Sequence, residues 1–156
     1  MKTLVIGAGL IGSQIARILV ERGEKPVLMD HAAQTKAIGE IVDLDRVTLI
    51  QGDVLRPLSI VDALRTHSIT RIAHTAANPL LTLGAQHEPY SAINLNIMGT
   101  VNVLEAARIS GVKRVVVSSS SVLNHYLAGG EDQGEFGREE AFPRPTTFYS
   151  ATKQAV

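Results

Sequence analysis

The sequence contains no cysteine and no tryptophan, and only 4% of its 156 residues are aromatic. Without cysteine the chain has no disulfide, no thiolate metal ligand and no thiol nucleophile, so a reducing cytoplasmic environment suits it. The scarcity of aromatic side chains argues against a surface on which nucleic-acid bases stack. Fifteen basic residues balance fifteen acidic ones, so no net charge attracts nucleic acid or an anionic membrane.

Long hydrophobic runs are also missing. No run reaches the roughly 18 residues that a bilayer-spanning helix needs, and the N-terminal residues turn into glycines too early for a secretory signal. The five histidines share no close ligand spacing, so we predict no metal site. With 45% apolar residues the chain can form a packed core. We therefore expect residues 1–156 to form one globular domain in the cytoplasm, with no nucleic-acid or membrane partner.

Short aliphatic runs alternate with stretches of helical periodicity along the whole chain. Strands that alternate with helices in this way form a parallel sheet covered by helices on both faces. The expected strands are 3–6, 26–29, 47–50, 71–75 and 115–117; the expected helices run from 12 to a glycine cap at 23, from 57 to 67 and from 89 to 109. The sequence therefore predicts an α/β fold with a doubly wound parallel sheet of the Rossmann type.

The apolar spacing within the expected helices also predicts which side chains lie on one face. For the second helix, Ile60, Val61 and Leu64 are expected to face inward. The other two expected stripes are Ile11, Ile15, Ile18 and Leu19 in the first helix and Ile93, Ile97, Val101 and Leu104 in the long helix. Residues 124–147 break the rhythm and are expected to form an acidic surface loop.

The segment 7–12 has the spacing Gly-x-Gly-x-x-Gly and lies between an expected strand and an expected helix. Glycines at Gly7, Gly9 and Gly12 allow a tight turn, close approach of a pyrophosphate and close helix packing, while Leu10 and Ile11 begin the helix, whose free amides bind anions. Asp30 ends the next strand, where a carboxylate accepts the ribose hydroxyls of an adenosine. A carboxylate there repels a 2′-phosphate, so the pattern favours NAD over NADP.

Tyr149 and Lys153 are four residues apart and therefore lie on one face of an expected helix. An ammonium beside a phenol favours the phenolate, which predicts that Lys153 lowers the pKa of Tyr149 and makes it a general base. The strand at 115–117 runs into four serines. One serine hydroxyl at that position could hold the oxygen of an alcohol substrate.

Several motifs occur together, in one order, over nearly the whole chain. In this set the chain resembles the N-terminal part of an extended short-chain dehydrogenase/reductase, the NAD-dependent epimerase/dehydratase family. The motifs are Leu4 to Ser13, Gly52-Asp53-Val54, His74-Thr75-Ala76-Ala77, Asn96 to Thr100, Leu104 to Ala107, Ser118 to Val122 and Tyr149 to Lys153.

The resemblance implies roles for individual residues. It implies that Asp53 and Val54 meet the adenine of NAD, and that Ala76 and Ala77 line the cofactor. It implies that Asn96 supports the active site and that Tyr149 and Lys153 are the catalytic base and its partner. The long helix resembles the family's dimerisation helix, which implies a homodimer of the complete protein.

The sequence departs from the family pattern in several places. The glycine loop is one residue shorter than the usual Gly-x-x-Gly-x-x-Gly, and Val122-Leu123-Asn124 replaces the usual Val-Tyr-Gly. The catalytic serine is Ser119 when counted back from Val122 and Ser120 when counted forward from Lys113-Arg114, so both remain candidates, and Ser119 is the preferred one. The chain also stops at Val156, before the strands and the substrate subdomain that the family carries.

We therefore expect an NAD-dependent oxidoreductase-type enzyme that acts on a secondary alcohol or ketone, a small molecule of the nucleotide-sugar class. Epimerase, dehydratase and simple dehydrogenase remain open, because the expected substrate part is absent. A dinucleotide-binding sensor, or a catalytically inert fragment, is the alternative from another class. A phosphate-binding signalling domain fits the glycine loop and Asp30 less well.

Overall fold

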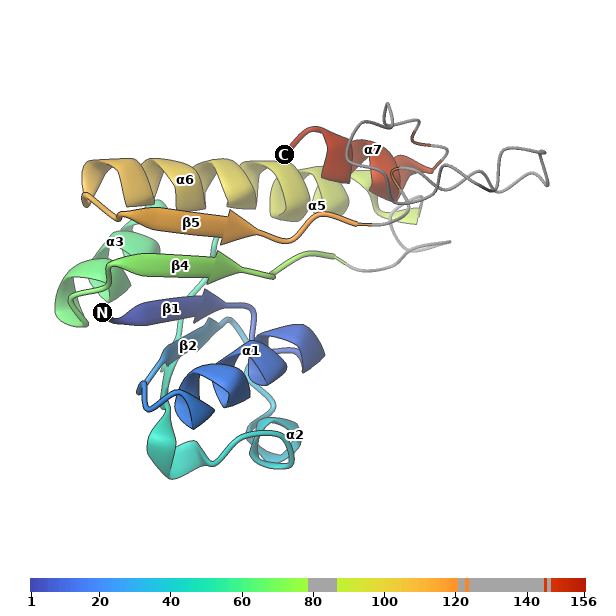
Figure 1. The fold of residues 1–156 in the computed structure, drawn as a ribbon. Coiled ribbons are helices and arrows are strands. Elements are labelled where there is room, and N and C mark those ends of the chain that lie inside the picture. Colours follow the sequence, from blue (N-terminus) through green and yellow to red (C-terminus); the bar gives the residue numbers. More distant parts are fainter. Residues whose placement is uncertain (79–86, 121–122, 124–144, 146) are drawn as a thin grey trace, which may run out of the picture.

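The computed structural model describes residues 1–78, 87–120, 123, 145 and 147–156. Five strands form one parallel sheet in the order β3-β2-β1-β4-β5, which confirms the predicted Rossmann-type fold (Figure 1). The strands are β1 Thr3–Ile6, β2 Val27–Asp30, β3 Thr48–Gln51, β4 Arg71–His74 and β5 Arg114–Val117. All five expected strands are present, each shifted by at most one residue at either end.

The helices lie on both faces of this sheet (Figure 1). They are α1 Leu10–Glu21, α2 Thr35–Gly39, the 3₁₀ turn η1 Leu44–Arg46, α3 Pro57–Thr66, α5 Pro89–Ile93, the π-helical turn η2 Asn94–Met98, α6 Gly99–Ile109 and α7 Phe148–Gln154. The expected long helix at 89–109 is confirmed as a continuous helix with a π turn inside it. The short α2 and η1 were not expected, because five and three residues show no periodicity.

The two faces of the sheet build two separate hydrophobic cores. Alternate residues of β1 divide between them: Leu4 and Ile6 pack with α3 and α6, whereas Val5 packs with α1 and α2. Both faces of the central strands are therefore buried, which explains why these strands are apolar at successive positions. Ile60 and Leu64 are buried as expected, and Val61 packs partly against the same core.

The predicted apolar stripe of the first helix is wrong in part. The residues that α1 buries are Gly12, Ser13, Ala16 and Val20, while Ile11 and Ile18 are exposed. Ile15 and Leu19 pack partly against the core. Small side chains form the buried face because the glycine loop brings the start of α1 into direct contact with β1, and this leaves no room for isoleucine.

The stripe expected on the long helix lies mostly on the surface. Ile93, Val101 and Leu104 are exposed, and Met98 beside them is exposed as well. The core-facing positions of α6 are instead Val103, Ala106 and Ala107. The acidic loop expected at 124–147, with Glu131, Asp132, Glu135, Glu139 and Glu140, lies almost entirely outside the described residues. Within the described ranges, no helix is both long and apolar enough to cross a bilayer.

Candidate functional site

A cavity of about 840 Å³ opens at the carboxyl ends of the strands. Residues from separate parts of the chain meet there, as expected for the crevice beside a doubly wound sheet. The predicted site residues that line it are Gly7, Gly9, Leu10, Ile11, Gly12, Asp30, Asp53, Val54, Ala76, Ala77, Ser119, Tyr149 and Lys153. Ser120 and Asn96 are the two predicted residues that are not part of the lining.

The three glycines of the loop play different roles. Gly7 has a φ of +94°, and a Cβ there would lie 2.6 Å from the backbone nitrogen of Ala76. A Cβ at Gly12 would lie 1.8 Å from the carbonyl oxygen of Gly7, so only glycine lets α1 start this close to β1. A Cβ at Gly9 would meet no atom within 4 Å and would point into open space. Gly7 and Gly12 are therefore required by the fold, whereas Gly9 is not.

The N-terminus of α1 faces the cavity with free backbone donors. Within the described residues no side chain caps this helix at Gly9, and Leu10 and Ile11 in its first turn are 67% and 59% exposed. The first amides of a helix have no partner inside the helix, and the helix dipole adds a partial positive charge at the same end. This end of α1 can bind an anion such as a pyrophosphate.

Asp30 ends β2, and its carboxylate is held by backbone amides. Oδ2 accepts a hydrogen bond from Ala8 N at 2.8 Å, and Oδ1 accepts one from Ala32 N at 2.9 Å. The ring of His31 adds a contact of 3.3 Å to Oδ1. Each carboxylate oxygen has two acceptor positions, so Asp30 can still accept hydroxyl groups from the cavity it lines.

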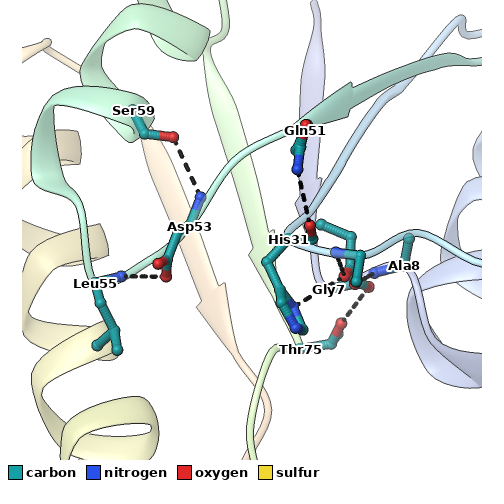
Figure 2. Close-up of polar contacts among 10 residues, drawn as sticks. Gly7, Ala8, His31, Gln51, Asp53, Leu55, Ser59 and Thr75 are labelled. Atoms are coloured by element: carbon teal, nitrogen blue, oxygen red, sulfur yellow. Dashed lines mark hydrogen bonds and ion pairs between the residues drawn. The ribbon is translucent and has the colours of Figure 1, made fainter.

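The loop after β3 is also ordered by a carboxylate. Asp53 accepts a hydrogen bond from Leu55 N at 2.9 Å, and its own backbone nitrogen donates to the hydroxyl of Ser59 at 3.2 Å (Figure 2). The amide of Asn102 in α6 donates to the carbonyl of Val54 at 2.9 Å. These bonds present Val54 and the Asp53 turn as one wall of the cavity.

The segment after β4 closes against the glycine loop. The Thr75 hydroxyl lies 2.9 Å from the carbonyl oxygen of Gly7 (Figure 2). It also lies 3.0 Å from the carbonyl oxygen of Ile6, so it can donate to either. Ala76 N also donates to the carbonyl of Ile6, at 3.0 Å. Ala76 and Ala77, which have small side chains, line the cavity.

The helix α7 brings Tyr149 and Lys153 to the other wall of the cavity. Thr147 and Ser150 form a reciprocal capping box at its start, which fixes where this short helix begins. The ammonium of Lys153 donates to the carbonyl of Ser118 at 3.0 Å and lies 6.0 Å from the centre of the Tyr149 ring. Ser120 forms a side-chain hydrogen bond with Tyr149, whereas Ser119 lines the cavity.

The net shift of the Tyr149 pKa is opposite to the one the sequence predicts. Burial raises the pKa of the Tyr149 phenol, and the hydrogen bond with Ser120 acts in the lowering direction. Lys153 is not among the groups that shift the pKa of Tyr149, and its ammonium donates to the Ser118 carbonyl instead. Burial also lowers the pKa of Lys153 itself.

Asn96 and His74 lie behind the cavity wall. Asn96 is buried, accepts a hydrogen bond from Asn78 N at 2.7 Å and donates to the hydroxyl of Thr152 at 2.9 Å. His74 is buried against Thr100, 3.1 Å from its hydroxyl, and burial together with the charge of Lys153 lowers the pKa of His74 to about 4. In this structure both residues support the lining rather than form it.

Sequence reasoning missed the part of the lining that comes from the long helix. Tyr90, Ser91, Asn94 and Leu95 line the cavity. Their spacing of one, four and five positions is typical of one helix face, which is the signal that could have identified them. Val122 and Asn124, where the sequence departs from the family pattern, lie outside the described residues. Within the described parts, no group of three or more His, Asp or Glu side chains could hold a metal ion.

Comparisons with known proteins agree with this geometry. The family model of the NAD dependent epimerase/dehydratase family matches residues 3–156. A UDP-glucose 4-epimerase of Yersinia pestis is 32% identical in an alignment 158 positions long, which covers 96% of this chain and 44% of that protein.

Two solved structures that resemble this chain are also UDP-glucose 4-epimerases. The UDP-glucose 4-epimerase of Thermus thermophilus in complex with NAD is 28% identical, with a TM-score of 0.81 over 99% of this chain and 48% of that one. The UDP-glucose 4-epimerase of Stenotrophomonas maltophila, with bound NAD and formylated UDP-arabinopyranose, is 28% identical, with a TM-score of 0.85 over 99% and 46%. The chain thus spans less than half of the length of each of these three proteins.

Proposed function

The chain belongs to the NAD dependent epimerase/dehydratase family, and from this premise we propose that residues 1–156 are the NAD-binding domain of an enzyme that acts on a nucleotide sugar. The observation that carries the proposal is the cavity in which the glycine loop, Asp30, Asp53 and the Tyr149–Lys153 pair meet. Its walls come from segments whose family roles are those of cofactor binding and proton transfer.

The residues of the cavity fit NAD. The uncapped start of α1 suits the pyrophosphate, and the open space beside Gly9 leaves room for it. The fixed carboxylate of Asp30 suits the ribose hydroxyls of the adenosine and disfavours a 2′-phosphate. Asp53 and Val54 then border the space for the adenine, and Ala76 and Ala77 border the middle of the cofactor.

We assign the chemistry to α7 and the end of β5. The Tyr149 phenolate takes the proton from a substrate hydroxyl and becomes the neutral phenol, and Lys153 holds the turn after β5 through the Ser118 carbonyl. NAD, when bound, supplies the hydride acceptor and donor for the oxidised carbon. Of the two candidate serines we favour Ser119 as the residue that positions the substrate oxygen, because Ser119 lines the cavity. Ser120 lies outside the lining and acts on Tyr149 through a side-chain hydrogen bond.

A paired titration tests the cofactor site. The purified chain is titrated with NADH and with NADPH, and binding is followed by nicotinamide fluorescence. We expect NADH to bind and NADPH to bind weakly, and we expect Asp30→Asn and Gly9→Ala each to weaken NADH binding by about tenfold or more. Gly39→Ala in α2 is the matched control, since Gly39 is not part of the cavity lining. Equal affinity for both cofactors, unchanged by Asp30→Asn, would overturn the proposal.

We also propose that the complete protein is a homodimer formed through the long helix. The exposed apolar side chains of Ile93, Met98, Val101 and Leu104 lie along one side of α5, η2 and α6, and such a surface is typical of a contact between copies. Sedimentation at micromolar concentration tests this. The wild-type chain should form dimers, whereas Leu104→Lys should stay monomeric and keep its circular dichroism.

A further inference from the structure

Thr152 lies between Tyr149 and Lys153 on α7 but faces away from the cavity. Its side chain is buried, and its hydroxyl makes two hydrogen bonds. It accepts from the amide nitrogen of Asn96 at 2.9 Å and donates to the backbone carbonyl of Tyr149 at 2.7 Å. A hydroxyl has one proton to donate, so the donor and acceptor roles at Thr152 are fully determined.

Asn96 extends this connection to the opposite wall of the cavity. Its side-chain oxygen accepts from Asn78 N at 2.7 Å, just after the segment that lines the cavity with Ala76 and Ala77. Asn96 lies in the π turn η2, and π turns often occur where a helix carries function. One buried amide therefore joins the end of β4, the long helix and α7.

The apolar contacts of α7 leave its rotation poorly defined. Apart from the Tyr149 ring, which packs with Phe148 and Ala92, the buried residues of this seven-residue helix are polar. The capping box sets where the helix starts, and Lys153 bonds to the Ser118 carbonyl only at the end of a flexible four-carbon side chain. The buried hydrogen bond between Asn96 and Thr152 joins two short side chains at 2.9 Å, so it defines which side of α7 faces the cavity.

We propose that Thr152 is a positioning residue, which holds α7 at the rotation that presents Tyr149 and Lys153 to the cavity. The inference rests on the proposed role of Tyr149 as the base. Thr152 acts through the backbone of α7 and the amide of Asn96, because its side chain lies outside the lining. Serine can replace it, since the hydroxyl makes both bonds, whereas valine has the same shape and makes neither.

The test compares Thr152→Val, Thr152→Ser and Thr3→Val. Thr3 is a buried, hydrogen-bonded threonine at the amino end of β1, on the side of the sheet away from the cavity. Thr3→Val therefore controls for the general effect of losing a buried hydroxyl. The first readout is the tyrosinate absorbance between pH 8 and 12. The same curve from a variant with an additional Tyr149→Phe substitution is subtracted, which removes the other two tyrosines of the chain.

The expected results separate positioning from plain stability. In Thr152→Val the phenol should become exposed, so its pKa should fall toward 10.0, the ordinary value, and NADH affinity should fall about tenfold. Thr152→Ser should restore both properties, and Thr3→Val should change neither. An unchanged phenol pKa in Thr152→Val, or an equal change in Thr3→Val, would overturn the inference.

Two further arrangements keep the test decisive. If Thr152→Val does not fold, the wild-type chain is studied by proton NMR, where a buried, doubly bonded Thr152 hydroxyl should exchange slowly enough to be observed; a rapidly exchanging hydroxyl would overturn the inference. The phenol titration needs no cofactor. Failure of the wild-type chain to bind NADH would therefore count against the proposed function alone, while the titration still decides the role of Thr152.

Discussion

The parallel strands have their carboxyl ends at one side of the sheet, the carboxyl edge, and their amino ends at the other, the amino edge. The two edges use the same kinds of residue in different ways. At the carboxyl edge, the carboxylates of Asp30 and Asp53 accept hydrogen bonds from backbone amides. At the amino edge, Arg71 pairs instead with Glu24 and the hydroxyl of Thr3. The carboxylates at the carboxyl edge order the loops that border the cavity, whereas the carboxylate at the amino edge neutralises a guanidinium.

Glycine makes the second difference between the edges. The carboxyl edge has a loop in which Gly7 and Gly12 approach other backbone atoms so closely that no side chain fits. The loop that follows α1 at the amino edge has Gly23, where a Cβ would meet nothing within 4 Å. The edge that holds the site is therefore the edge where the backbone is most tightly packed, and substitutions there should have the larger effects.

The largest effect is expected from Gly12→Ala. Because the new Cβ would lie 1.8 Å from the Gly7 carbonyl oxygen, α1 must move away from β1, and we expect a loss of about 4 kcal/mol in the free energy of unfolding. Urea denaturation measures it. Gly9→Ala, which adds the same methyl group into open space, should cost only about 0.5 kcal/mol. Similar losses in the two variants would contradict the packing argument.

A loss of stability comparable to that of Gly12→Ala is expected at the carboxyl edge when the pH is lowered. Burial, with the charge of Lys153, lowers the pKa of His74 from 6.5 to about 4. The folded state therefore binds a proton at His74 only at a lower pH than the unfolded state does. The stability contributed by neutral His74 is fully present above pH 6.5 and is lost as the pH falls to 4, about 3 kcal/mol in all. Urea denaturation at pH 7 and pH 4 should show this loss. His74→Gln should remove most of it, and an unchanged pH dependence in that variant would exclude His74 as the cause.

At the amino edge the expected effect is smaller. The hydrogen bond from Arg71 lowers the pKa of the Glu24 carboxyl below 4.5, so this pair stabilises the fold above that value and loses its contribution as the pH falls through the folded pKa. Glu24→Gln should cost about 1 kcal/mol at pH 7, and the difference from wild type should shrink at acidic pH. NADH affinity should not change, because Glu24 lies at the edge opposite the cavity.

Most of the fold followed from the sequence, since β-branched runs and helical spacing indicate strands and helices from local residues alone. The errors concern which face of a helix is buried, not whether the helix is present. The isoleucines of α1 look like its core face, but the close approach at Gly12 selects Gly12, Ser13 and Ala16 instead. Which helix face is buried depends on the distance to the sheet, and no spacing within the helix reports that distance.

For the site, the place of the glycine loop and Asp30 in the cavity lining was predictable, because both directly follow or end a strand of the sheet. The environment of Tyr149 was not, since it depends on where α7 lies against β5. Spacing places Lys153 beside Tyr149, but it does not show that the ammonium turns to the Ser118 carbonyl or that Ser120 is the residue bonded to the phenol. The partnership of Asn96 and Thr152 joins residues 56 positions apart and has no local signal.

The smallest effect is expected for the ion pair of Arg108 and Glu105 on α6. It has the same chemistry as the pair of Arg71 and Glu24, but its side chains are 70% and 56% exposed, against 28% and 24%. Water and salt screen exposed charges, and ordering two long side chains offsets the attraction that remains. Glu105→Gln should therefore leave the urea midpoint unchanged within error, both at low salt and at high salt. A loss equal to that of Glu24→Gln would show that burial does not decide what such a pair contributes, and the contrast between the two edges would then have to rest on glycine packing alone.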